Sequence, residues 1–219
     1  MSISLDEAVE LTRTGDLWVF RGRSVPDRAI QLTTNSPVNH VGMAVVLDDM
    51  PPLLWHAELG RSLPDLWTGT HQRGVQLHDL RDAVCVWANR YGQRGWLRQL
   101  EPPADEEMER AVLRTIARLD GTPFPSTAQL AWRWLRGRVP SPRLPLPTTR
   151  RREPASRDLA LETAYCAEVV AVTYEAMGLL PTGRRPNWYD PGRFWSGDDL
   201  GLHGDARLGS EIEVRIPSR

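Results

Sequence analysis

The sequence predicts an α+β fold in which an antiparallel sheet packs against a buried central helix. Short runs rich in valine and leucine, separated by proline and turn residues, fill much of the first ninety positions and are typical of strands. Apolar residues recur every three or four positions between Pro103 and Leu119, which is the period of a helix. The segment from Cys166 to Met177 is apolar nearly all round, so we expect it to be the buried helix.

The N-terminal half is expected to supply most of the sheet. Ser4 is a candidate N-cap for a short helix that stops at Thr14-Gly15, and a second helix is expected over 24–34. The segments 39–47 and 53–59 flank Pro51-Pro52 and are expected to pair as an antiparallel hairpin. The complete set of strands expected in this half is 16–20, 39–47, 53–59, 75–77 and 84–90.

The C-terminal half is expected to be mainly helical. After the helix of 103–119, a shorter helix is predicted over 126–136, followed by an irregular Pro/Arg-rich loop near 138–160. Gly178 is the expected C-cap of the helix that carries Cys166, and one late strand is predicted over 211–216. Without a repeat or a linker, residues 1–219 are expected to form a single domain.

Composition excludes several classes of function. All 27 basic residues are arginine, so the chain has neither a Schiff-base lysine nor a phosphate-loop lysine. A formal net charge of −1 provides no global field for nucleic acid, and two cysteines cannot form a secreted disulfide framework. Acidic residues near the start and the lack of a long apolar run argue against a signal peptide or a membrane span, so a cytoplasmic location is expected.

Cys166 and His40 are the residues whose chemistry stands out. Cys166 begins an apolar helical segment, where unpaired N–H groups and the positive end of the dipole favour a thiolate. His40 opens a valine-rich strand, and its ordinary pKa of about 6.5 suits proton transfer near neutrality. Papain-type enzymes place the cysteine first and the histidine later, so cooperation between these two residues implies a circularly permuted layout.

A base of this kind needs a third group that holds its imidazole in place. The strand after His40 contains Trp55-His56-Ala57-Glu58, and alternation along a strand puts His56 and Glu58 on one face. Either side chain could reach a histidine on the paired strand.

Three segments resemble the motifs of circularly permuted NlpC-type papain-like cysteine hydrolases. They are Gly15-Asp16 before a strand, Ala29 to Ser36 followed by Asn39-His40-Val41-Gly42-Met43, and Tyr165-Cys166-Ala167-Glu168-Val169-Val170 continuing to Tyr174. Bacterial members commonly carry glutamate before the alanine of the second strand. Here that position is His56, as in the related lecithin:retinol acyltransferase branch, and Glu58 is the reserve candidate.

The resemblance implies a cysteine hydrolase, either an amidase or peptidase or an esterase, that works through a Cys–His–His triad and a thioester acyl-enzyme. Cys166 would be the nucleophile, His40 the base, and His56 the group that orients His40. The Cys166 backbone N–H would help to form an oxyanion hole, with Tyr165 as a possible lining residue. The alternatives are a lipid or amine acyltransferase on the same triad, and a non-catalytic binding module that retains the fold.

The expected partner is a small-molecule, peptide or lipid substrate, with no nucleic acid and no cofactor. No metal site is expected either, because His71, His78 and His203 are interpreted as ordinary surface residues and no two-histidine helix motif is present. Contact with a membrane surface is the lesser alternative for Trp132 and Trp134, which are otherwise interpreted as part of an amphipathic core helix.

Overall fold

The structure is a computed structural model that describes residues 2–22, 37–123, 154–182, 189–196 and 200–218, with only the backbone described over 154–164. The strands are β1 (Ser2–Ser4), β2 (Leu17–Arg21), β3 (His40–Val45), β4 (Leu53–Glu58), β5 (Gly74–Asp79), β6 (Arg94–Arg98), β7 (Leu100–Glu101), β8 (Arg207–Leu208) and β9 (Ile212–Arg215). The helices are α1 (Leu5–Leu11), α3 (Leu80–Tyr91), α4 (Glu106–Leu119), α6 (Pro154–Ala176) and the 3-10 helix η2 (Pro191–Phe194).

Seven strands form one sheet in the order β1-β9-β6-β2-β3-β4-β5. Every neighbouring pair is antiparallel except β1 and β9, and β7 pairs with β8 in a separate small sheet. The expected α+β class and the antiparallel hairpin of β3 with β4 are therefore confirmed. Within the described ranges, no helix is both long enough and apolar enough to cross a membrane.

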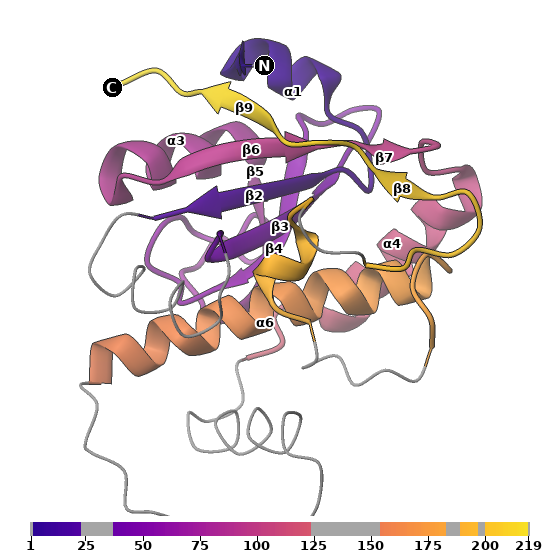
Figure 1. Cartoon of the computed structure of the whole chain (residues 1–219). Coiled ribbons are helices and arrows are strands. Elements are labelled where there is room, and N and C mark those ends of the chain that lie inside the picture. The colour runs from indigo at the N-terminus through magenta and orange to yellow at the C-terminus, as the bar shows by residue number, and fades with distance from the viewer. Residues whose placement is uncertain (1, 23–36, 124–153, 183–188, 197–199, 219) are drawn as a thin grey trace, which may run out of the picture.

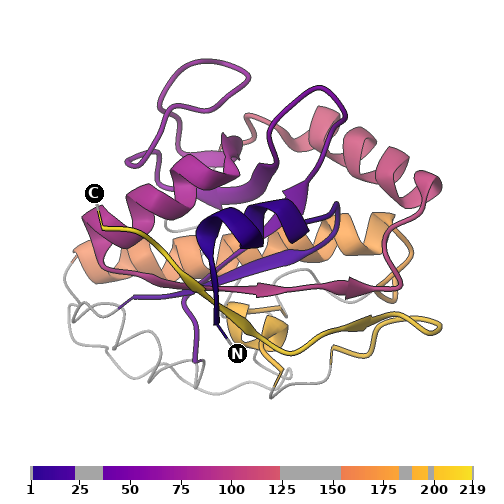
Figure 2. The same cartoon turned by 90° about the horizontal axis from the view of Figure 1, so that it is seen from above.

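Helices cover both faces of the large sheet, which gives the molecule three layers. Helix α6 lies along one face, and α1 and α3 lie on the other, as Figure 1 shows from the side and Figure 2 from above. Each layer boundary has its own hydrophobic core, which we call the α6-side core and the α3-side core. Strand alternation divides the side chains between them, because Leu17 and Val19 join the α6-side core whereas Trp18 and Phe20 join the α3-side core.

The segment Gly15-Asp16 joins several of these elements. The backbone of Gly15 has φ 90°, which favours glycine, and its carbonyl accepts a hydrogen bond from the Tyr174 hydroxyl of α6 at 2.6 Å. The buried Asp16 carboxylate accepts the backbone N–H groups of Arg13 at 2.9 Å and Leu100 at 2.8 Å. These contacts give the Gly15-Asp16 segment a structural role, because they tie the start of β2 to α6 and β7.

The sequence-based assignment of 84–90 as a strand is wrong, because these residues belong to α3. The Asp79 side chain caps that helix by accepting the N–H of Asp82, and Gly92 ends it in the left-handed conformation. A continuous apolar run fits either a buried strand or a helix, and the caps that lie outside the run decide between them. Cys85, one of the two cysteines, is buried in α3.

Helix α6 begins at Pro154, twelve residues before Cys166, so the predicted start at Cys166 is also wrong. Proline is well suited to a first helical position, and the following residues are rich in Ala, Leu and Glu, which favour helix. The last part of the loop expected near 138–160 is thus helical. The rest of that loop, and the helices expected over 24–34 and 126–136, lie outside the described residues.

Candidate functional site

Three histidines from three neighbouring strands form a hydrogen-bonded chain beneath α3. Nε2 of His40 on β3 lies 3.2 Å from Nδ1 of His56 on β4. Nε2 of His56 in turn lies 3.0 Å from Nδ1 of His78 on β5. All three residues are buried, with 5%, 0% and 1% of their surfaces exposed, respectively. Five percent exposure of His40, at the first position of β3, makes it the member of the chain closest to solvent.

The sheet and α3 together fix these rings. The three histidines are even-numbered residues on strands whose odd-numbered neighbours, among them Val41, face the α6-side core. Trp87 of α3 packs over them, with its ring centroid 4.5 Å from that of His40 and 5.0 Å from that of His56, in edge-on geometry. The histidines are therefore held in an apolar, water-poor space between β3, β4, β5 and α3.

Burial keeps these imidazoles neutral. Desolvation lowers the pKa of His40 to about 3 and holds the pKa of His56 well below its usual range, and the charge on His78 acts in the same direction on both. Desolvation also lowers the pKa of His78 to about 4, although the nearby Asp65 carboxylate opposes this change. A neutral ring has one N–H and one lone pair, so each histidine can donate to one neighbour and accept from another, or bind a metal.

Glu58 lies at the end of β4, beside the histidine chain. Only 3% of this residue is exposed, and its carboxylate accepts hydrogen bonds from the backbone N–H and the hydroxyl of Ser62. Desolvation raises its pKa, against the effect of the Ser62 hydrogen bonds. Glu58, His56 and His78 each offer one ligand atom, and these three atoms lie within 4.8 Å of one another. The three side chains could therefore share a metal ion.

Two buried polar atoms in this region make no hydrogen bond to any described residue. They are Oε1 of Gln76, the β5 residue that pairs directly with His56, and Nε2 of His78, although the backbone carbonyl of Leu63 lies near enough to the His78 ring to raise its pKa. Buried polar atoms without a partner are uncommon in proteins and often mark the place of a water or an ion. The amide nitrogen of Gln76 contacts the carbonyl oxygens of Gln72 and Gly74, so only its oxygen remains available.

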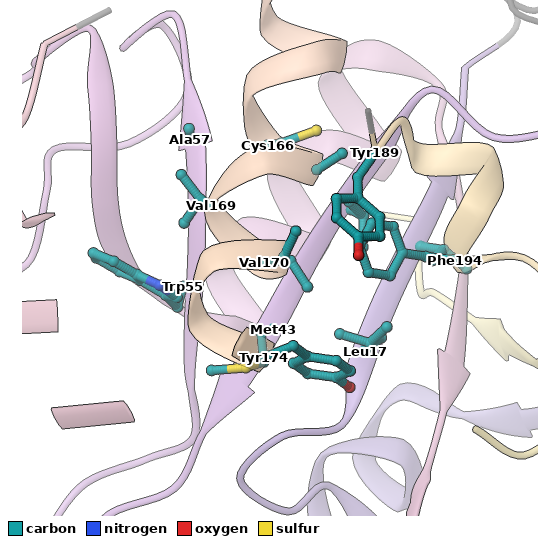
Figure 3. Close-up of a cluster of buried hydrophobic side chains, with 14 of the residues drawn as sticks. Leu17, Met43, Trp55, Ala57, Cys166, Val169, Val170, Tyr174, Tyr189 and Phe194 are labelled. Atoms are coloured by element: carbon teal, nitrogen blue, oxygen red, sulfur yellow. The ribbon is translucent and has the colours of Figure 1, made fainter. Parts of the chain in front are cut away.

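Cys166 does not lie in this chain. It is fully buried in the α6-side core, where Figure 3 shows it on α6 together with Val169 and Val170, with Ala57 of β4 nearby. The imidazole of His40 faces the opposite side of the sheet, against Phe20 and Trp87. Strand alternation therefore places the Cys166 thiol and the His40 imidazole on different faces of the sheet, which opposes the predicted contact between them.

The predicted oxyanion hole fails for a related reason. Cys166 is in the interior of α6, where backbone N–H groups donate to carbonyls within the helix rather than to a ligand. Tyr165 precedes it and also belongs to the α6-side core, away from the histidines. Neither residue is placed to stabilise an anion beside His40.

The predicted partner of His40 is in place, but the prediction missed two further buried residues of this site, His78 and Gln76. His56 contacts His40, and no hydrogen bond between Glu58 and His40 occurs among the described residues. His78 is buried rather than a surface residue, whereas His71 and His203 are exposed as expected. Extending the predicted strand 75–77 by one residue would have shown Gln76 and His78 on one face, next to His56 and Glu58.

Comparisons with known proteins give little beyond this geometry. No family model matches the chain, and no curated protein matches it. One similar solved structure is the metalloprotein yiiX from Escherichia coli O157:H7, of family DUF1105, with 21% identity and a TM-score of 0.45. The match covers 75% of this chain and 65% of that one, so the chain spans less than two thirds of its length. A similarity this weak carries no inference about activity.

Proposed function

We propose that this chain is a binding protein for a divalent transition metal, with His56, His78 and Glu58 as its ligands. The observation that carries the proposal is the convergence of these three donors within 4.8 Å in a buried space. Two imidazoles and one carboxylate form a donor set typical of Zn²⁺. Because burial keeps both rings neutral, the ion would not have to displace a proton from either histidine near pH 7.

The spacing of the ring nitrogens supports Zn²⁺. With Zn–N bonds of 2.0–2.1 Å, tetrahedral geometry separates two ligand nitrogens by about 3.3 Å. Nε2 of His56 and Nδ1 of His78 are 3.0 Å apart, so binding would need only a small separation of the two rings. In this arrangement Nδ1 of His56 carries its proton and donates to Nε2 of His40, which would orient the ligand ring.

Metal titration of the chelator-treated protein tests the proposal. We expect one Zn²⁺ per chain by calorimetry, and a visible Co²⁺ spectrum typical of tetrahedral nitrogen and oxygen ligands. The His78→Gln and Glu58→Gln variants should lose most of the affinity, while His203→Gln should retain it because this residue is exposed and outside the cluster. Failure to bind, or equal binding by all three variants, would refute the proposed site.

The thiol hydrolase, or an acyltransferase on the same residues, is the second candidate, and the permuted papain-like arrangement belongs to it. The hydrogen bond between His40 and His56 favours it, since these are the base and the orienting residue that the motifs suggest. The position of Cys166 on the other face of the sheet opposes it. A small-molecule, peptide or lipid substrate and a cytoplasmic location remain part of this candidate.

Alkylation by iodoacetamide separates the two candidates. A catalytic Cys166 would react faster than a free thiol below pH 8.5, and His40→Ala would remove that reactivity. The observed burial predicts instead that native Cys166 reacts far more slowly than a free thiol, and that unfolding restores its reactivity.

A further inference from the structure

A pocket of about 440 Å³ lies on the opposite side of the sheet from the histidine cluster. Its floor consists of Val45, Leu53 and Leu77, which belong to three neighbouring strands and to the α6-side core. Ile116 of α4 forms one wall. The volume lies in the range of small-molecule sites, and the walls are mainly apolar, as is usual for such sites.

An exposed tryptophan stands at the rim of this pocket. Trp67 belongs to the connection between β4 and β5 and is 66% exposed, although it lines the pocket. Leu113 of α4 also lines it and is 43% exposed. Large apolar side chains that remain exposed around a concave site are typical of surfaces that bind a ligand.

The loop that carries Trp67 is anchored by a buried carboxylate. Asp65 is fully buried, and its two side-chain oxygens accept the backbone N–H groups of Leu77 at 2.9 Å and Thr68 at 2.8 Å. The N–H of Leu66 donates to the carbonyl of Leu77 at 2.8 Å. Two of these bonds attach Asp65 and Leu66 to β5, and the third holds Thr68 to Asp65, so the backbone on either side of Trp67 is anchored.

Asp120 is the charged residue in the lining. Its Oδ1 is buried and makes no hydrogen bond to a described residue, and no ion pair within the described ranges involves it. It caps the carboxyl end of the fourteen-residue helix α4, where the helix dipole also favours a positive ligand. Desolvation and the nearby Asp65 raise its pKa, which is the effect expected of a carboxylate that lacks a cation.

We propose that this pocket binds a small molecule with an apolar body and a protonated amine. The apolar body would lie on Val45, Leu53 and Leu77 and under Trp67, and the amine would donate to Oδ1 of Asp120. The pocket is separate from the proposed metal site, because the two lie on opposite faces of the sheet.

Three probes with the same apolar body and different charges test this proposal. They are naphthalen-1-ylmethylamine, naphthalen-1-ylmethanol and naphthalen-1-ylacetate, titrated into the full chain by calorimetry at pH 7.5. We expect the amine to bind at least about tenfold more tightly than the alcohol, and the acetate to bind most weakly, because a charged hydrogen bond is stronger than a neutral one.

Two variants assign the binding to the named residues. Asp120→Asn should abolish the preference for the amine while leaving weak binding of the alcohol, and Trp67→Ala should weaken the amine and the alcohol alike. Both positions are partly or largely exposed, so thermal unfolding should show that both variants remain folded. Equal affinity for the three probes, no binding of any probe, or an amine preference that survives in Asp120→Asn would overturn the proposal.

Discussion

Acidification from pH 7.0 to 5.5 should destabilise this protein far more than a protein with exposed histidines. His40, His56 and His78 all have lowered pKa values in the folded state, to about 3 for His40 and about 4 for His78. An unfolded chain binds protons at its histidines near pH 6.5. Their stabilising contribution is therefore fully present above pH 6.5 and is lost as the pH falls toward the folded pKa values.

The size of this loss follows from proton linkage. With an unfolded pKa of about 6.5 and a folded pKa lowered by burial, each histidine lowers the free energy of unfolding by slightly more than roughly 1 kcal/mol between pH 7.0 and 5.5. Three such residues give about 4 kcal/mol, a large part of the 5–15 kcal/mol that stabilises a typical domain. The result depends little on how far below 5.5 the folded values lie, because the folded protein then binds almost no proton at these sites.

Urea unfolding in the presence of a chelator, at pH 7.0 and 5.5, measures this effect. Buried carboxyls with raised pKa values act in the opposite direction, because the folded protein takes up their protons at a higher pH than the unfolded chain does, and they therefore subtract from the loss that the histidines produce. His78→Gln should lose about a third less stability than the unchanged protein on acidification, whereas His203→Gln should match it. A pH-independent free energy of unfolding, or an unaltered loss in His78→Gln, would show that these rings are not held neutral.

Further substitutions test other parts of the fold. Thr173→Val should lower the free energy of unfolding by about 1–3 kcal/mol, because Nε1 of Trp55 donates to the Thr173 hydroxyl at 3.0 Å in the core and would lose its acceptor. Urea unfolding measures this loss, and an unchanged unfolding midpoint would contradict the prediction. Asp16→Asn should cost a similar amount, about 1–3 kcal/mol, because the amide oxygen can accept only one of the two backbone N–H groups that the carboxylate satisfies, and the amide nitrogen cannot accept the other. A hundredfold excess of Zn²⁺ over its Kd should stabilise the protein by about 2.7 kcal/mol and shift its thermal midpoint upward, and His78→Gln should abolish that shift.

Local sequence signals were sufficient for the class of fold and for many of its elements. The apolar runs of 39–47 and 53–59, divided by Pro51-Pro52, predicted a hairpin that the structure contains as β3 and β4. The three- and four-residue spacing of 103–119 likewise predicted α4. The segment 84–90 was misassigned because its unbroken apolar residues, 84–88, show no period, and its helical state depends on Asp79 and Gly92 outside the segment.

The sequence by itself determined which residues could carry chemistry, and it correctly put His56 and Glu58 on one face of a strand, because the two-residue period of a strand is a local property. Only the tertiary structure decided which of those residues meet. The packing of α6 and α3 against opposite faces of the sheet separates Cys166 from His40, and the register of β4 with β5 brings His78 to His56. Both outcomes depend on contacts between distant segments, and the sequence around each residue does not specify which layer will cover its face of the sheet.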